Sequence, residues 1–195
     1  MSGSKNNFMK FDAKRLTYLS VLTAIVFVLQ YLSFFTRFTV FSLTFVLVPI
    51  VIGVALCGWV AGPWLGFVFG LAVLISGDAA LFLEFSIFGT IVTVLLKGML
   101  AGLAAAVVYT LFEKKNRYLA VVLAAVSAPI VNTGVFFLGS VVFFFKDIMS
   151  YWNLEAGAVV PFVITGLIGI NFIIEVAVNL VLVPTVYRLI QIKKK

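Results

Sequence analysis

The chain has 195 residues, of which 64% are hydrophobic, and it carries a formal net charge of +7. A water-soluble domain of this length cannot bury so much apolar surface, so this composition excludes an ordinary soluble fold. The sequence has no histidine and a single cysteine, Cys57, which excludes an internal disulfide, a cysteine metal cluster and any histidine-based metal site or general base. We attribute the positive charge to membrane topology and anionic lipid, and we expect no nucleic-acid partner.

All but three of the 14 basic residues lie in three clusters. The clusters are the N-terminal tail, one short loop and the C-terminal tail (Lys5, Lys10, Lys14 and Arg15; Lys114, Lys115 and Arg117; Arg188, Lys193, Lys194 and Lys195). Basic residues stay on the cytoplasmic side of membrane proteins, so the three clusters should share that side. An even number of membrane spans must therefore separate each cluster from the next.

Six apolar segments are candidates for these spans, since a helix needs about 20 apolar residues to cross a bilayer. In chain order they cover roughly residues 16–35, 41–57, 64–75, 88–112, 118–145 and 159–190. The third is short, and the sixth is long enough to require tilting. Residues 77–87 and 146–157 are predicted to be outer loops, the first partly helical. The segments predict an all-α integral membrane protein, one domain over 1–195, with six transmembrane helices and both termini cytoplasmic.

Small residues recur every four positions in two of these segments. Gly58, Gly62, Gly66 and Gly70 line the third segment and the turn before it, and the fourth carries Gly98, Gly102 and Ala106. This spacing lets helix backbones approach closely. We interpret it as packing within the bundle, with a contact surface for another subunit as the alternative. Ser20 and Ala24 have the same spacing in the first segment.

Lys97 lies about nine residues inside the outer end of the fourth segment, or roughly 14 Å at 1.5 Å per residue. A lysine at that depth requires a carboxylate, backbone carbonyls or a water-filled cavity. Glu175 lies at a comparable depth in the sixth segment. One interpretation is a structural Lys97–Glu175 pair that fixes helix register. The other is a solvated pocket in which Lys97 binds an anionic ligand.

Further polar residues occupy the interiors of the last two segments. Asn171, Glu175 and Asn179 are four apart and form one helical stripe, which should face the bundle interior. Asn132 follows Pro129, whose ring frees a backbone carbonyl, so Asn132 either repairs that carbonyl or contacts a ligand. Groups from three helices then converge on one polar cavity. We therefore predict a substrate site of Lys97, Asn132, Asn171 and Glu175.

The first outer loop holds Arg37 among several phenylalanines, which are typical of interfacial anchors. We expect Arg37 and Phe38 to form a gating loop over the pocket. No phosphate-binding loop and no nucleophile–base constellation is visible. The chain is therefore not predicted to be an enzyme, and no cofactor or metal is expected.

Three stretches carry a family resemblance: residues 47–53 (LVPIVIG), 58–70 (GWVAGPWLGFVFG) and 128–134 (APIVNTG). With the chain length and the six predicted helices, they resemble the substrate-binding S-component of energy-coupling factor (ECF) transporters, which are bacterial vitamin importers. The resemblance covers nearly the whole chain. It implies a high-affinity subunit of an ABC-type importer in the bacterial cell membrane. Within the family, the chain looks most similar to pantothenate-specific members, with folate, riboflavin, hydroxymethylpyrimidine or thiamine, and cobalamin left open.

The same resemblance implies partners encoded elsewhere, namely one transmembrane coupling (T) subunit and two ATPase subunits that use ATP. The family's first helix meets the T subunit through an Ala-x-x-x-Ala face. Here that face reads Ser20 to Ala24, with serine in place of the first alanine. Two other classes remain: a stand-alone secondary transporter with Lys97 and Glu175 as an ion site, and a structural membrane scaffold, which would bind no small molecule.

Overall fold

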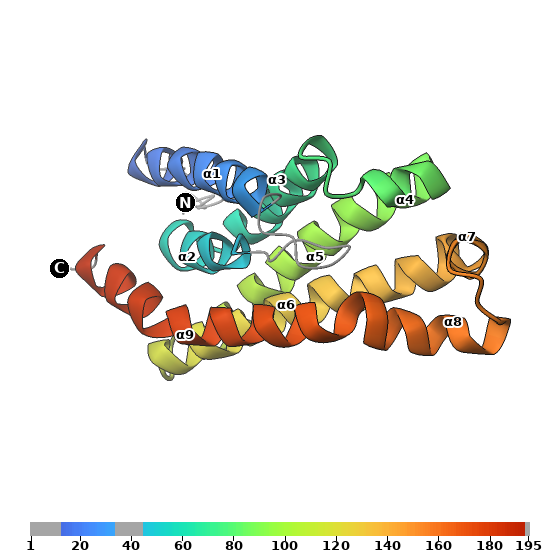
Figure 1. Ribbon diagram of the computed structural model, residues 1–195. Helices are drawn as coiled ribbons and strands as arrows, with labels where there is room; N and C mark the ends of the chain where they lie inside the picture. The colour runs from blue at the N-terminus through green and yellow to red at the C-terminus, as the bar shows by residue number, and fades with distance from the viewer. Residues whose placement is uncertain (1–12, 34–44, 194–195) are drawn as a thin grey trace, which may run out of the picture.

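The computed structural model describes residues 13–33 and 45–193, in which the regular elements are helices joined by short turns, with no strand (Figure 1). This agrees with the predicted all-α class. The elements in chain order are α1 (Ala13–Ser33), α2 (Leu47–Cys57), α3 (Ala61–Ile75), α4 (Ala80–Phe85), α5 (Ile87–Phe112), α6 (Arg117–Phe143), α7 (Phe145–Tyr151), α8 (Ala156–Phe162), η2 (Val163–Gly169) and α9 (Ile170–Lys193).

Among the described residues, four helices are long and apolar enough to cross a membrane: α1, α5, α6 and the continuous helix Ala156–Ile192 that joins α8, η2 and α9. The predicted second and third segments correspond to the shorter α2 and α3, of 11 and 15 residues. At 1.5 Å per residue, α2 is about 16 Å long, roughly half of a ~30 Å hydrocarbon core.

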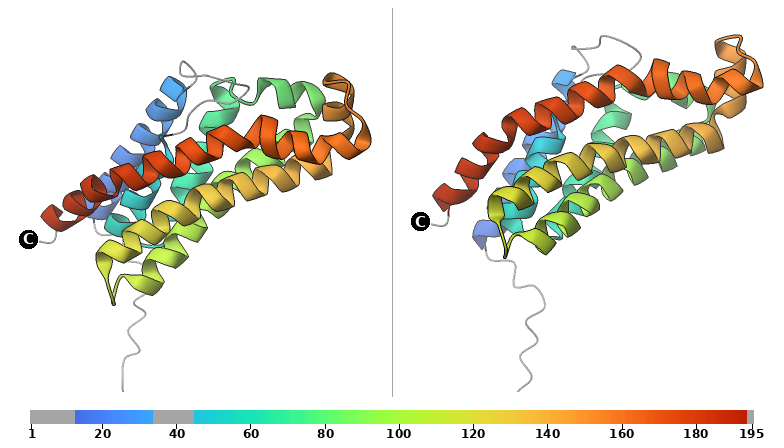
Figure 2. Two further views of the ribbon diagram at one scale, coloured as in Figure 1. Left: turned by 60° about the horizontal axis from the view of Figure 1, so that its bottom comes forward. Right: turned by 90° about the horizontal axis from the view of Figure 1, so that it is seen from below.

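The two ends of the bundle differ in charge. The start of α1, the turn between α5 and α6, and the last turns of α9 lie at one end, whereas α4, α7 and the start of α8 lie at the other (Figures 1 and 2). Described members of all three basic clusters, such as Arg15, Lys115 and Arg188, therefore share one end. This is the arrangement that the charge pattern requires, and the side of the membrane that this end faces stays a prediction.

The glycine stripes of α3 and α5 pack against each other. A side chain on Gly66 would collide with the backbone of Gly98, and one on Gly62 with the backbone of Gly102. At Gly70, an added Cβ would lie 2.9 Å from the Val94 carbonyl oxygen. These contacts account for the small-residue spacing as packing within the bundle, which was the first interpretation of the sequence.

Two stretches differ from the sequence expectation. The predicted loop 146–157 contains α7, a helix held by the buried side chains of Phe144 and Ile148 in an aromatic cluster at this end of the bundle. The last helix is not uniformly α-helical, because residues Val163–Gly169 form wider π turns. Pro161 precedes them and lacks an amide hydrogen for the regular ladder, which favours a local departure from α geometry.

Candidate functional site

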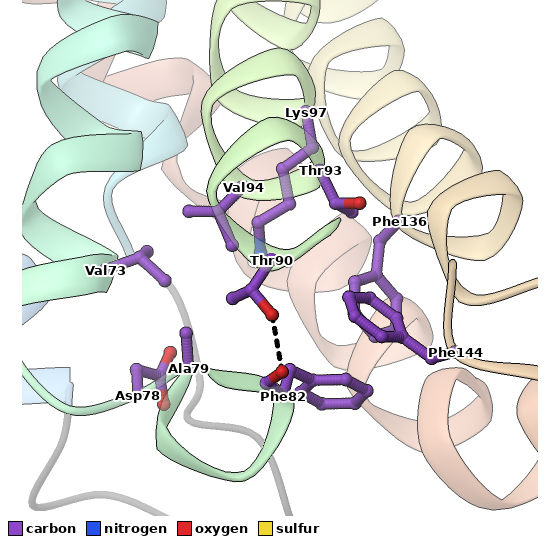
Figure 3. A pocket seen from close by; sticks show the side chains of 10 residues that line it. All are labelled: Val73, Asp78, Ala79, Phe82, Thr90, Thr93, Val94, Lys97, Phe136 and Phe144. Atoms are coloured by element: carbon purple, nitrogen blue, oxygen red, sulfur yellow. Dashed lines mark hydrogen bonds between the residues drawn. The ribbon is translucent and has the colours of Figure 1, made fainter. Parts of the chain in front are cut away.

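A small cavity of about 20 Å³ lies toward the α4 and α7 end of the bundle (Figure 3). Residues from α3, the turn after it, α4, α5, α6 and the α6–α7 junction line it: Val73, Asp78, Ala79, Phe82, Thr90, Thr93, Val94, Lys97, Phe136 and Phe144. Most of the wall is apolar or aromatic, and a few polar groups project from it. This composition is typical of small-molecule sites.

Lys97 enters the cavity from α5. Its side chain runs along the helix toward Thr90, as Figure 3 shows, and so toward the α4 end. Its Nζ lies 5.6 Å from the ring centroid of Phe69 and 5.6 Å from that of Phe136. Ammonium groups at such distances from ring faces are attracted by the ring quadrupole. Aromatic contacts therefore stabilise the ammonium without consuming its hydrogen-bond donors.

Two carboxylates act on Lys97 electrostatically, those of Asp78 and Glu175. Within the part of the chain that the structure describes, Lys97 forms no ion pair closer than 4.0 Å with either of them. The direct Lys97–Glu175 pair that the sequence allowed is thus not formed in this conformation. The ammonium keeps donors that a ligand in the cavity can use.

Asn132 and Glu175 lie beside the cavity rather than in its wall. Both side chains are buried, on α6 and α9 respectively, and the Asn132 side chain interacts favourably with the charged form of the Glu175 carboxyl group. One oxygen of each, Asn132 Oδ1 and Glu175 Oε1, has no partner among the described residues. The Glu175 carboxylate attracts the ammonium of Lys97, which lines the cavity.

The predicted stripe on α9 does face inward. Glu175 and Asn179 are buried, and Asn179 Nδ2 donates to the Glu175 backbone oxygen at 2.7 Å. Asn171, one turn earlier, is half-buried and does not line the cavity. The gating residues Arg37 and Phe38 lie outside the described residues.

Sequence reasoning missed several lining residues. Asp78 looked like part of an outer loop, yet it reaches the cavity from the turn after α3. Thr90 Oγ1 donates to the Phe82 backbone oxygen at 2.6 Å, which joins α5 to α4, and Thr93 Oγ1 has no partner among the described residues. The one available signal was Gln30, an amide within an apolar segment, whose Nε2 donates to Asp78 Oδ2 at 3.2 Å.

The family model for the ECF transporter, substrate-specific component, matches residues 14–187. The chain belongs to this family. The match extends from α1 into α9 and so includes every residue of the cavity. No curated protein and no solved structure gives a significant match. This S-component is a multi-pass membrane protein and a transport subunit without catalytic chemistry, and membership of the family implies association with an ECF module.

The S-component's α1 exposes one face. Ser20 and Ala24 lie on it, and Ser20 borders a groove of about 240 Å³ between α1 and α3. Trp64 closes the groove on the α3 side, and its Nε1 donates to Thr23 Oγ1 at 3.1 Å. The face is apolar and carries only small side chains at Ser20 and Ala24, so another helix could approach it closely.

Proposed function

We propose that this S-component binds a small, water-soluble vitamin in the cavity of Figure 3, and that the vitamin is pantothenate. One observation carries the proposal: the Lys97 ammonium lies in an aromatic cavity with no ion pair among the described residues. A ligand carboxylate there would form a charge-assisted hydrogen bond, which is stronger than a neutral one. The phenylalanine wall would cover the aliphatic part of the ligand.

The predicted neighbours of Lys97 have separate roles in this proposal. Glu175 and Asn132 hold the ammonium in place from α9 and α6. Asn171 contributes a contact when the ligand is bound, from the same stripe of α9. Arg37 and Phe38 gate the pocket. Support comes from the shared burial of Glu175 and Asn132, from the interaction of Asn132 with Glu175 and from the electrostatic attraction between Glu175 and Lys97.

We also propose that the chain crosses the bacterial cell membrane six times, with both termini in the cytoplasm. The short helices α2 and α3 would complete the six passes, because both are apolar and lie within the bundle. The common end of the basic clusters supports an even number of passes between them. The cavity would then open toward the outside.

The partners proposed are a T subunit, which would contact α1 at Ser20 and Ala24, and two ATPase subunits, which would use ATP. The exposed apolar face of α1 and its adjoining groove support the first contact. No cofactor is proposed for this chain.

The direct test is a ligand screen on the purified chain. Isothermal titration calorimetry with pantothenate, folate, riboflavin, hydroxymethylpyrimidine, thiamine and cobalamin should give tight binding for pantothenate alone. Native mass spectrometry of the chain, purified from its source membrane, should show a bound mass equal to that of pantothenate. Tight binding of another vitamin would overturn the substrate. Binding of none would favour a structural scaffold, and ligand uptake by vesicles that contain only this chain would favour a secondary transporter.

A further inference from the structure

Gln30 lies on the packing side of α1, in line with Leu22 and Val26, and its side chain has no solvent-exposed surface. A buried amide within a membrane helix is unfavourable unless it is hydrogen-bonded. Its Nε2 donates to Asp78 Oδ2 at 3.2 Å, across 48 positions of sequence. This bond joins the last turn of α1 to the turn between α3 and α4.

That turn places Asp78 in the wall of the cavity. Gly77 adopts a φ of 80°, which favours glycine, and Ala79, the residue after Asp78, is buried against the cavity. The Gly77 oxygen accepts a hydrogen bond from the Ala80 amide at 3.2 Å, which closes the turn. Asp78 therefore approaches the cavity from the α3–α4 side, whereas Lys97 approaches from α5 (Figure 3).

The two charges of the cavity wall are attracted to each other, yet Lys97 forms no direct ion pair with any described residue. A carboxylate has about four acceptor positions, so Asp78 can accept a hydrogen bond from a ligand in addition to the contacts it already makes, of which the bond from Gln30 is one. We propose that Asp78, held in place by Gln30, is a second polar anchor of the cavity. Asp78 is thereby a specificity-determining residue, and Gln30 is the positioning residue that orients it.

This assignment narrows the substrate class, and in that respect it rests on the proposed function. A ligand held at both anchors carries an anionic group for Lys97 and a hydroxyl or amide hydrogen for Asp78. Its intervening part packs on Phe82, Phe136 and Phe144. A plain carboxylic acid without donors satisfies only one anchor, because it forms no hydrogen bond with Asp78.

The charge of Asp78 in the cavity can be measured without any vitamin. In a Cys57→Ala background, the variant Lys97→Cys places a thiol in the cavity, and Cys57 is the chain's only cysteine. Its rates of modification by 2-aminoethyl methanethiosulfonate, a cation, and 2-sulfonatoethyl methanethiosulfonate, an anion, are compared. We expect the cation to react faster, and Asp78→Asn to lower the cation-to-anion ratio at least about fivefold because one nearby unit charge is removed.

Gln30→Leu should also lower this cation-to-anion ratio, because Asp78 loses its hydrogen bond from α1. If the leucine variant does not fold, Gln30→Met replaces it in the same measurement. Thr23→Val is the matched control, because it removes a different interhelical hydrogen bond of α1, the one from Trp64. It should leave the ratio unchanged. A ratio that is insensitive to both Asp78→Asn and the Gln30 variants overturns the proposal, and so does a thiol at position 97 that neither reagent reaches.

The ligand arm uses pantothenate and its analogue with both hydroxyls replaced by hydrogen. The wild-type chain should prefer pantothenate at least about tenfold, which corresponds to one well-placed hydrogen bond to a charged group. Asp78→Asn should remove most of this preference, a result that general destabilisation would not produce. An unchanged preference overturns the role of Asp78 in specificity. If the wild-type chain binds no pantothenate, the proposed substrate is wrong. The modification rates of the Lys97→Cys thiol then decide by themselves whether Asp78, positioned by Gln30, is an anchor of the cavity.

Discussion

Replacing Lys97 with methionine separates a ligand-binding role from a structural one. The substitution keeps an unbranched side chain between Phe69 and Phe136 and removes the ammonium, so the packing of the cavity wall is largely preserved. It leaves Asp78 and Glu175 without the cation that attracts both of them. If Lys97 holds a ligand carboxylate, that carboxylate also loses its partner.

The magnitude follows from the site. Truncating one partner of a buried, hydrogen-bonded charge pair costs about 2–5 kcal/mol, because the other charge stays buried and unpaired. Lys97 is partly accessible through the cavity, so the lower end of this range applies. Since 1.4 kcal/mol is a factor of ten, binding should weaken at least about tenfold and more nearly thirtyfold. Loss of the contacts with two aromatic rings adds a smaller destabilisation, about 0.5–1 kcal/mol for each ring.

The assay is calorimetric titration of pantothenate into Lys97→Met, Glu175→Gln and the double variant, with the melting temperature of each measured in the same detergent. Lys97→Arg should restore binding only in part, because a guanidinium is larger than an ammonium and directs its donors differently. Lys146→Met is the matched control, because it removes an exposed lysine of α7 at the same end of the bundle and should change nothing.

The competing interpretation gives a different pattern. If Lys97 serves only to balance Glu175, each single change should lower the melting temperature, since each leaves one buried charge unbalanced. The double change should then recover stability, and its affinity for pantothenate should equal that of the wild-type chain. Wild-type affinity in the double variant would refute the reasoning that places the ligand at Lys97.

Three further predictions concern the rest of the chain. In a Cys57→Ala background, a thiol introduced by Ser150→Cys should react with an impermeant maleimide added outside intact cells, and one introduced by Lys115→Cys should not; the reverse pattern would invert the topology. Ala24→Trp should abolish vitamin uptake by the assembled transporter but leave binding to the isolated chain intact, because the crossing of two close helices cannot hold an indole; unchanged uptake would remove this face from the partner interface. Gly66→Ala should destabilise the chain by about 1–3 kcal/mol, because the new Cβ meets the backbone of α5, whereas Gly134→Ala meets no atom within 4 Å and should be neutral or stabilising in thermal unfolding.

The long helices could be predicted closely from local composition alone. The fourth and fifth apolar segments, 88–112 and 118–145, correspond to Ile87–Phe112 and Arg117–Phe143. A bilayer accepts only helices whose backbone groups are satisfied internally, so a long apolar run has one available structure. The four-residue spacing of the glycines also predicted close helix packing, because small residues let two helix backbones approach. It did not identify the facing helix, because Gly66 could have packed against any small-residue stripe, and only tertiary structure selects Gly98.

The site was predictable only where a single residue was conspicuous by itself. Lys97 and Glu175 stood out because an ionisable group within an apolar segment is unfavourable without a partner. Asp78 did not, because a carboxylate in a predicted loop needs no explanation, and its tie to Gln30 depends on how α1 packs against α3. The orientation of the α9 stripe was also undetermined. The π turns at Val163–Gly169 take up more residues per turn than α turns, so they change the rotation of every later residue about the helix axis. Residues four apart also drift by about 40° around a helix of 3.6 residues per turn, so one stripe can differ in burial along its length. Glu175 and Asn179 are buried, whereas Asn171 is half-buried and outside the cavity wall.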